Sequence, residues 1–148
     1  MGTGTMRTGG CLCGAVRFKA AETGSFGVCH CTQCQRWAGS ALFGVTVPEA
    51  AMSIAGAENI GTYRSSAWAS RSFCKTCGSA LWYRPDMGVD GAGDYEVPIG
   101  LLDDPGGLDL HREIFIDRKP DSWTLVGDHP RLTEAETLAL YGPSTEGA

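Results

Sequence analysis

The amino-acid sequence predicts a mainly β fold, built from antiparallel strands with one or two short helices. Most apolar and β-branched residues fall in short runs, and only two segments carry helical signals. The 21 glycines are scattered along the chain rather than periodic, which is typical of tight turns between short strands. Because no long helix separates successive strands, antiparallel pairing is favoured.

Several segments are expected to form strands. The first alternates, with Val16 and Phe18 on one face and charged side chains on the other. Another is rich in apolar and β-branched residues and stops at Pro48. Pro98 lacks a backbone N–H and therefore predicts an edge or a bulge in the strand that contains it. The strand-like segments are residues 15–19, 41–47, 68–73, 80–83, 95–101 and 113–116.

Two short helices are expected. The first spans residues 32–37 and is ended by Gly39. The second begins at Thr133, where Glu136 three residues further on completes a capping box. It stops before Gly142, which is followed by a proline.

The length of 148 residues fits one domain. An apolar fraction of 43% is that of a globular chain rather than a disordered one. We expect a single domain over residues 9–142, with flexible tails at 1–8 and 143–148. The Gly/Asp-rich segment 85–94 is expected to be a solvated loop.

Charge and hydropathy argue against two classes of partner. The formal net charge is −5 and no dense run of Lys and Arg occurs, which argues against a nucleic-acid partner. No apolar stretch reaches the roughly 20 residues that span a bilayer, which argues against a membrane protein. The N-terminus lacks the apolar region of a secretory signal, so a cytoplasmic location is expected. A homodimer is compatible with the sequence.

All seven cysteines lie in three tight clusters. A disulfide scaffold favours an even number of cysteines in an exported chain. Here the number is odd and no export signal is present, so metal binding is the favoured interpretation. The clusters are Cys11-Leu12-Cys13, Cys29-His30-Cys31-Thr32-Gln33-Cys34 and Cys74-Lys75-Thr76-Cys77.

The first and third clusters each supply a pair of ligands. Cys11 and Cys13 share one face of an extended strand, because residues i and i+2 point the same way. Cys74 and Cys77 have the spacing of a zinc knuckle. Structural zinc takes four ligands, so the two pairs are expected to meet across the fold and hold one ion.

The middle cluster has only three cysteines. Cys29 and Cys31 share a strand face, and Cys34 turns back toward them as the helix begins. Catalytic zinc typically has three protein ligands and one open position, which predicts a second, labile zinc here. Completion by His111, His129 or an acidic group would instead make a structural site. A reversible disulfide among the three cysteines after metal loss is another alternative.

Three neighbours of the middle cluster are candidate functional residues. His30 lies between two ligands and should point away from the zinc, toward a packing or hydrogen-bonding partner. Arg36 is a candidate contact for a substrate carboxylate, with a solvated arginine as the competing interpretation. Trp37 is a candidate substrate contact, although the four tryptophans are otherwise expected in the core.

With their flanking residues, the three clusters resemble the glutathione-dependent formaldehyde-activating enzyme family. The resemblance rests on residues 9–18, 29–36 and 71–79, in that order and spacing. Residues 113–116 and 119–123 are similar to the family more loosely. Glu113 stands where many members carry a histidine.

The resemblance implies a β-tent fold of antiparallel sheets with two zinc ions. It implies carbon–sulfur lyase chemistry, in which a thiol such as glutathione joins a small aldehyde such as formaldehyde to give S-hydroxymethylglutathione. A coordinated thiol loses its proton, and zinc polarises a carbonyl as a Lewis acid. The implied ligands are Cys11, Cys13, Cys74 and Cys77 for structural zinc, and Cys29, Cys31 and Cys34 for the catalytic ion. The alternative is a non-catalytic, zinc-scaffolded module that binds a thiol or a protein.

Overall fold

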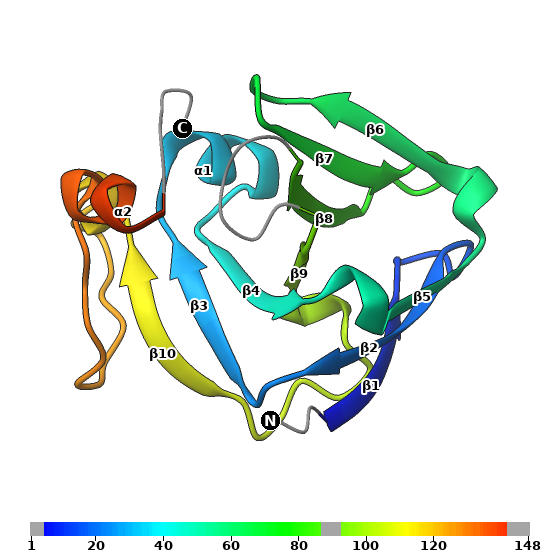
Figure 1. Ribbon diagram of the computed structural model, residues 1–148, viewed down its shortest axis with the longest axis horizontal. Helices are drawn as coiled ribbons and strands as arrows, with labels where there is room; N and C mark the ends of the chain where they lie inside the picture. The colour runs from blue at the N-terminus through cyan, green and yellow to red at the C-terminus, as the bar shows by residue number, and fades with distance from the viewer. Residues whose placement is uncertain (1–4, 87–92, 142–148) are drawn as a thin grey trace.

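The computed structural model describes residues 5–86 and 93–141, and in them ten strands form two sheets (Figure 1). The smaller sheet has the order β1-β2-β5, with strands Thr5–Gly10, Arg17–Glu22 and Met52–Ala55. The larger sheet has the order β10-β3-β4-β9-β8-β7-β6. In that order its strands are Asp109–Ile114, Ser25–Cys29, Leu42–Val47, Tyr95–Pro98, Ala80–Pro85, Ala69–Cys74 and Ile60–Arg64. The prediction of a mainly β fold is confirmed.

Strand pairing in the described residues is antiparallel except at one edge of the larger sheet. There β10 runs parallel to β3, with Ile114 opposite Cys29. The sequence did not indicate this parallel edge. A hairpin forces antiparallel pairing, whereas β10 returns to β3 only after the chain has passed through six other strands. The result places the end of β10 beside the middle cysteine cluster.

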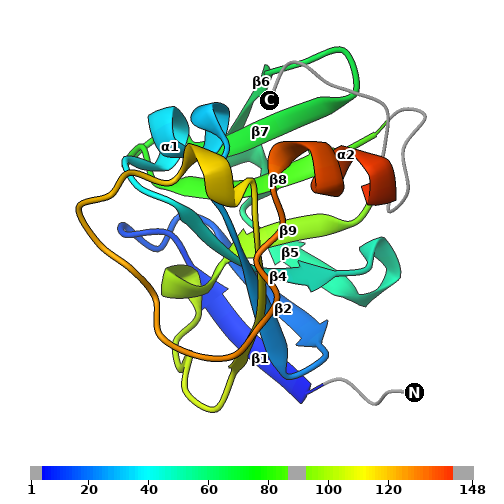
Figure 2. The ribbon, with the colours of Figure 1, turned by 90° about the vertical axis from the view of Figure 1, so that its left-hand side faces the viewer.

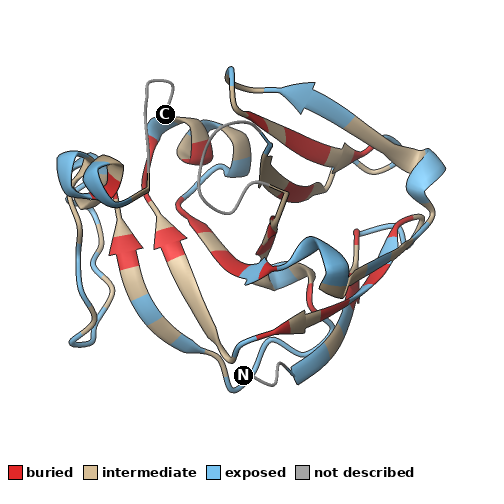
Figure 3. Ribbon diagram, in the orientation of Figure 1, coloured by how far each residue is buried: buried red, intermediate tan, exposed pale blue. Residues whose placement is uncertain are grey.

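The main core lies between the two sheets. Trp82 on β8 packs edge-on against Phe18 of β2, with ring centroids 5.7 Å apart, and against Tyr95 of β9 at 5.4 Å. Buried residues, red in Figure 3, recur along β4 and β7. Phe18 is buried while its neighbour Lys19 is exposed, as the alternation predicted. Among the tryptophans only Trp82 is fully in the core, and the other three keep part of their surface exposed.

Two α-helices lie in the upper part of the molecule as drawn in Figure 2. The first, α1 (Thr32–Ala38), ends at Gly39, whose positive φ of 82° is the left-handed C-cap that glycine favours. The second, α2 (Glu134–Tyr141), begins after Thr133. The Thr133 amide donates to the Glu136 carboxylate, and the Glu136 amide donates to the Thr133 hydroxyl. Both helices and the capping box are therefore confirmed.

Some expectations about segments differ from the structure. β1 begins at Thr5, so residues 5–8 pair with β2 rather than forming a tail. The 95–101 segment is a strand only to Pro98, after which residues 99–101 form a 3₁₀ turn. Pro98 ends a strand inside the sheet, so the expected edge or bulge is wrong. At a strand end, the missing N–H costs no internal ladder bond.

The remaining segment predictions fall at the limits of the described chain. Most of the 85–94 loop and the 143–148 tail lie outside the described residues. Three further 3₁₀ turns occur at Glu49–Ala51, Ala57–Asn59 and Ile116–Arg118. Within the described residues, the helices are all too short or too polar to cross a membrane.

Candidate metal centres

The first and third cysteine clusters meet across the fold, as the sequence predicted. The Sγ atoms of Cys11, Cys13, Cys74 and Cys77 all lie within 4.8 Å of one another. The Cys11–Cys13 and Cys13–Cys74 sulfur distances are 3.7 and 3.8 Å. Zn–S bonds of about 2.3 Å in a tetrahedron require sulfurs about 3.8 Å apart. The four thiols therefore fit a tetrahedral zinc ion.

Backbone amides support this sulfur cluster. The amides of Thr76 and Cys77 donate to the Cys74 sulfur at 3.4 and 3.5 Å, which is the tight turn of a CxxC knuckle. The amide of Val16 donates to the Cys11 sulfur at 3.3 Å. Such donors stabilise thiolates, and here they come from both halves of the site. The ion would therefore join the turn between β1 and β2 to the end of β7 and the turn that follows it.

The middle cluster forms where β3 passes into α1. Cys29 ends β3, Cys31 is the N-cap of α1 and Cys34 lies in its first turn. Their three sulfurs lie within 4.8 Å of one another. The Cys34 amide donates to the Cys31 sulfur at 3.3 Å, so one thiol both caps the helix and faces the cluster. Local geometry alone therefore assembles the second site.

The three sulfurs are too close to ionise independently. Hydrogen bonds from Cys29 and Cys34 lower the pKa of the Cys31 thiol to about 3. The contact with Cys31, then that with Cys34 and burial, raises the pKa of the Cys29 thiol well above its ordinary value. One sulfur is thus favoured as an anion, and three thiolates together require a cation. This donor set fits zinc.

The second cluster opens onto a cavity of about 260 Å³, which Cys29, Cys31 and Cys34 all line. Within the described chain, no histidine or carboxylate joins the three sulfurs as a fourth ligand. His129 is hydrogen-bonded to Glu113, and His111 to the Phe26 carbonyl. The donors present therefore match a zinc site with one open position.

Arg71 on β7 supplies positive charge beside this cluster, a role that sequence reasoning missed. Its Nη1 donates to the Cys34 sulfur at 3.6 Å, and its Cζ lies 5.1 Å from the centroid of the Trp37 ring and 4.7 Å from that of the Tyr83 ring. Arg71 is buried, yet no carboxylate among the described residues forms an ion pair with it. The sequence signal that could have indicated this role is the position of Arg71 at the start of residues 71–79, which resemble the family.

The two candidate substrate contacts on α1, Arg36 and Trp37, differ in their surroundings. Arg36 is exposed on α1 and does not line the cavity, so its contact with a substrate carboxylate stays a prediction. Trp37 packs against the group formed by Cys31, Cys34 and Leu42 and supports Arg71. It does not line the cavity either, and a direct substrate contact stays a prediction.

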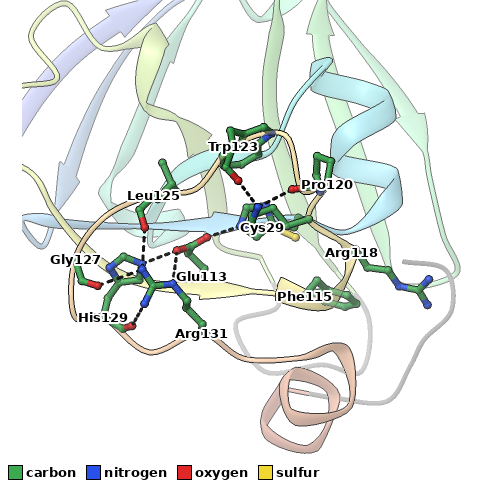
Figure 4. A network of polar contacts seen from close by, with 12 residues as sticks. Cys29, Glu113, Phe115, Arg118, Pro120, Trp123, Leu125, Gly127, His129 and Arg131 are labelled. Carbon is green, nitrogen blue, oxygen red and sulfur yellow. Dashed lines mark hydrogen bonds and ion pairs between the residues drawn. The ribbon is translucent and has the colours of Figure 1, made fainter.

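Glu113 is the centre of a buried polar network beside the second cluster (Figure 4). Its two carboxylate oxygens accept from His30 Nε2 and His129 Nε2, each at 2.6 Å, and Arg131 Nε lies at 3.2 Å. Burial opposes ionisation, but hydrogen bonds from His129 and His30 lower the pKa of Glu113. His30 thus makes the hydrogen bond expected of it, and this bond anchors the chain between two cysteines of the second cluster.

We expect two zinc ions per chain, one held tightly and one labile. The four-thiolate site supplies all four ligands of a tetrahedral ion, whereas the three-thiolate site leaves one position open to competing ligands. Elemental analysis after anaerobic purification with zinc supplied measures the total, and a brief chelator treatment separates the two populations. A maximum of one zinc per chain would contradict the two-site arrangement.

Comparisons with known proteins agree with this geometry. Residues 6–118 match the model of the family described as glutathione-dependent formaldehyde-activating enzyme. An uncharacterized lyase of Schizosaccharomyces pombe is 30% identical over 131 residues, which cover 88% of this chain and 93% of the relative. A putative glutathione-dependent formaldehyde-activating enzyme of Halomonas elongata is 32% identical over 83 residues, about half of each protein.

A solved structure shares the fold. The crystal structure of a Rhodobacter sphaeroides protein superposes with a TM-score of 0.55 at 20% identity, covering 84% of this chain and 98% of the other. The family match spans all three cysteine clusters and most of both sheets. The chain therefore belongs to the glutathione-dependent formaldehyde-activating enzyme family.

Proposed function

We propose that this protein joins a thiol, glutathione or a close relative, to a small aldehyde such as formaldehyde, giving S-hydroxymethylglutathione. The observation that carries the proposal is the three-thiolate cluster opening onto a cavity, with a buried arginine against one sulfur. Family membership and the relatives named as a lyase and as a putative formaldehyde-activating enzyme support a lyase of this class.

Zinc on Cys29, Cys31 and Cys34 would supply a position that holds the substrate thiol as a thiolate and a Lewis acid for the carbonyl. Three thiolates leave a divalent ion with a net negative charge, and a substrate thiolate adds another. Arg71 offsets part of this charge, because its guanidinium lies against the Cys34 sulfur in a buried setting. Arg71 is therefore proposed to favour binding of the ionised thiol.

Tyr83 is proposed to assist at the aldehyde oxygen. It lines the same cavity, and burial raises its pKa to about 12, so its hydroxyl remains a proton donor at neutral pH. In the reaction, the thiolate sulfur bonds to the carbonyl carbon and the carbonyl electron pair moves to oxygen. That oxygen takes up one proton, which balances the proton lost by the thiol.

Glutathione is expected to bind the zinc-loaded protein, and its adduct with formaldehyde is expected to form faster in the protein's presence. Calorimetry measures the binding, and NMR with ¹³C-labelled formaldehyde follows the adduct. Because the adduct also forms without catalysis, the same mixture without protein is the essential control. The variant Cys31→Ser is expected to remove the acceleration, since one metal ligand is lost.

The two parts of this test separate enzyme from binding module. Glutathione binding without faster adduct formation would reject the enzyme and leave the alternative, a zinc-scaffolded thiol-binding module. No glutathione binding, with the second zinc present by analysis, would require another thiol or a purely structural role.

A further inference from the structure

The cavity beside the second cysteine cluster has a second, charged end. Cys29 pairs with Leu42 at one end of β4, and Glu96 pairs with Thr46 near the other. Four residues along a strand span about 13 Å, so the cavity wall extends roughly that far from the sulfurs to Glu96. All four residues line the cavity. A ligand that used both ends would therefore be elongated.

Two glycines keep the middle of the cavity clear. Gly27 on β3 pairs with Gly44 on β4, and both line the cavity. A Cβ atom at Gly27 would lie 3.4 Å from His111 Cε1, and one at Gly44 would lie 3.6 Å from Glu96 Oε1. A larger side chain at either position would therefore grow into the space between the cysteine end and the charged end.

The charged end holds two residues of opposite charge, Glu96 and Arg112, that do not form an ion pair with each other. Glu96 accepts a hydrogen bond from the Thr46 hydroxyl at 2.6 Å, and Arg112 stacks on the Tyr141 ring at 4.6 Å. Within the described chain, neither Glu96 nor Arg112 has an ion-pair partner within 4.0 Å. Burial raises the pKa of Glu96 and lowers that of Arg112, as expected for charges short of partners. The pair offers one acceptor and one set of donors to a ligand.

We infer that Glu96 and Arg112 bind the amino-acid head of a peptide thiol, with Glu96 accepting from its ammonium group and Arg112 donating to its α-carboxylate. This inference rests on the proposed function, which supplies the thiol at the other end. A tripeptide extends to about 10–11 Å, which spans the cavity once hydrogen-bond lengths are added. An α-linked first residue uses its α-carboxyl group in the peptide bond, whereas a γ-linked glutamyl residue keeps both groups free, so the site should prefer γ-glutamyl thiols to α-linked ones.

Calorimetry on the zinc-loaded protein tests the inference with two thiols. Arg112→Gln and Glu96→Gln are expected to weaken glutathione binding about tenfold to a hundredfold, because each removes a charge-assisted hydrogen bond. Binding of 2-mercaptoethanol, which has no head group, should stay unchanged. Lys19→Gln is the matched control, since it removes one positive charge from an exposed site outside the cavity, and glutathione binding should not change.

A ligand change tests the same contact without relying on the fold of a variant. Glutathione lacking its α-amino group should bind the wild-type protein about tenfold or more weakly than glutathione. In Glu96→Gln the two ligands should differ much less in affinity, because glutamine keeps an acceptor oxygen but removes the negative charge that pairs with the ammonium. Equal affinity of the two ligands for the wild-type protein would overturn the assignment of Glu96.

The outcomes separate this inference from the proposed function. Unchanged glutathione affinity in both variants, with 2-mercaptoethanol still binding, would overturn the charged end and leave the proposed function standing. If glutathione binds without speeding adduct formation, the proposed function fails, and S-methylglutathione, whose sulfur cannot become a thiolate, then tests the charged end alone. Binding of S-methylglutathione to the wild-type protein, with loss of that binding in Arg112→Gln, would support the inference. Failure of S-methylglutathione to bind the wild-type protein would overturn it.

Discussion

Cys77→Ser is expected to unfold the domain, whereas Cys31→Ser is expected to leave it folded. Cys77 belongs to the site that joins the turn between β1 and β2 to the end of β7 and the turn that follows it. Structural zinc contributes about 10–16 kcal/mol of apparent binding free energy, which matches or exceeds the 5–15 kcal/mol net stability of a typical domain. Loss of one ligand therefore removes a large share of the stabilising free energy.

The second cluster makes a smaller contribution to folding. Its three cysteines come from six consecutive residues, so an ion there closes no long loop. Serine at position 31 also keeps an oxygen that can cap α1 in place of the sulfur. Circular dichroism during heating compares the two variants with the wild-type protein. An equal loss of thermal stability in both would show that this division of roles is wrong.

Glu113→Ala is expected to destabilise the protein by about 3–5 kcal/mol at neutral pH, because it leaves buried polar groups without their partner. His30, which is fully buried, loses its hydrogen bond to Glu113 Oε1, and His129 loses its hydrogen bond to Glu113 Oε2. Urea unfolding measures the difference in the free energy of unfolding. Glu134→Ala is the matched control: it breaks a partly exposed pair with Arg118 and should cost at most about 1 kcal/mol.

The Glu113 contribution should also depend on pH. Its native pKa lies below the ordinary value of 4.5, so the native state binds the proton less readily than the unfolded state. The stabilisation is then fully present above about pH 4.5 and is lost as the pH falls through the lower native pKa. The difference in stability between wild type and Glu113→Ala should therefore shrink in acid. A difference that stays constant to acid pH would argue against an ionised Glu113.

Much of the metal chemistry was predictable because it depends on local spacing. Cys29, Cys31 and Cys34 converge through one strand end and one helical turn, and no distant residue is needed to bring their sulfurs together. The caps of both helices were predictable for the same reason, since Gly39 and Thr133 act on their immediate neighbours. Pairing of the CxC and CxxC motifs followed from the ligand number of structural zinc.

Several strands could not be predicted from their own residues. β3 and β6 are short and carry polar residues or glycine, so they show little of the periodicity that marks a strand, and β5 alternates over only four residues. Their conformation comes from hydrogen bonds to neighbouring strands, such as the pairing of β6 with β7. The parallel edge of β10 is of the same kind, because pairing direction after a long connection is decided by the packing of the whole chain.

By itself, the sequence determined the mainly β class, the seven candidate ligands and their division into four and three. Only the tertiary structure decided what surrounds the second cluster. Arg36 is adjacent in sequence but exposed on its helix, whereas Arg71 comes from β7 and lies against a cluster sulfur. Glu96 and Arg112 likewise meet the same cavity from two different strands. Ligand spacing is a local property of the backbone, but the charges around a buried site come from strands that only folding brings together.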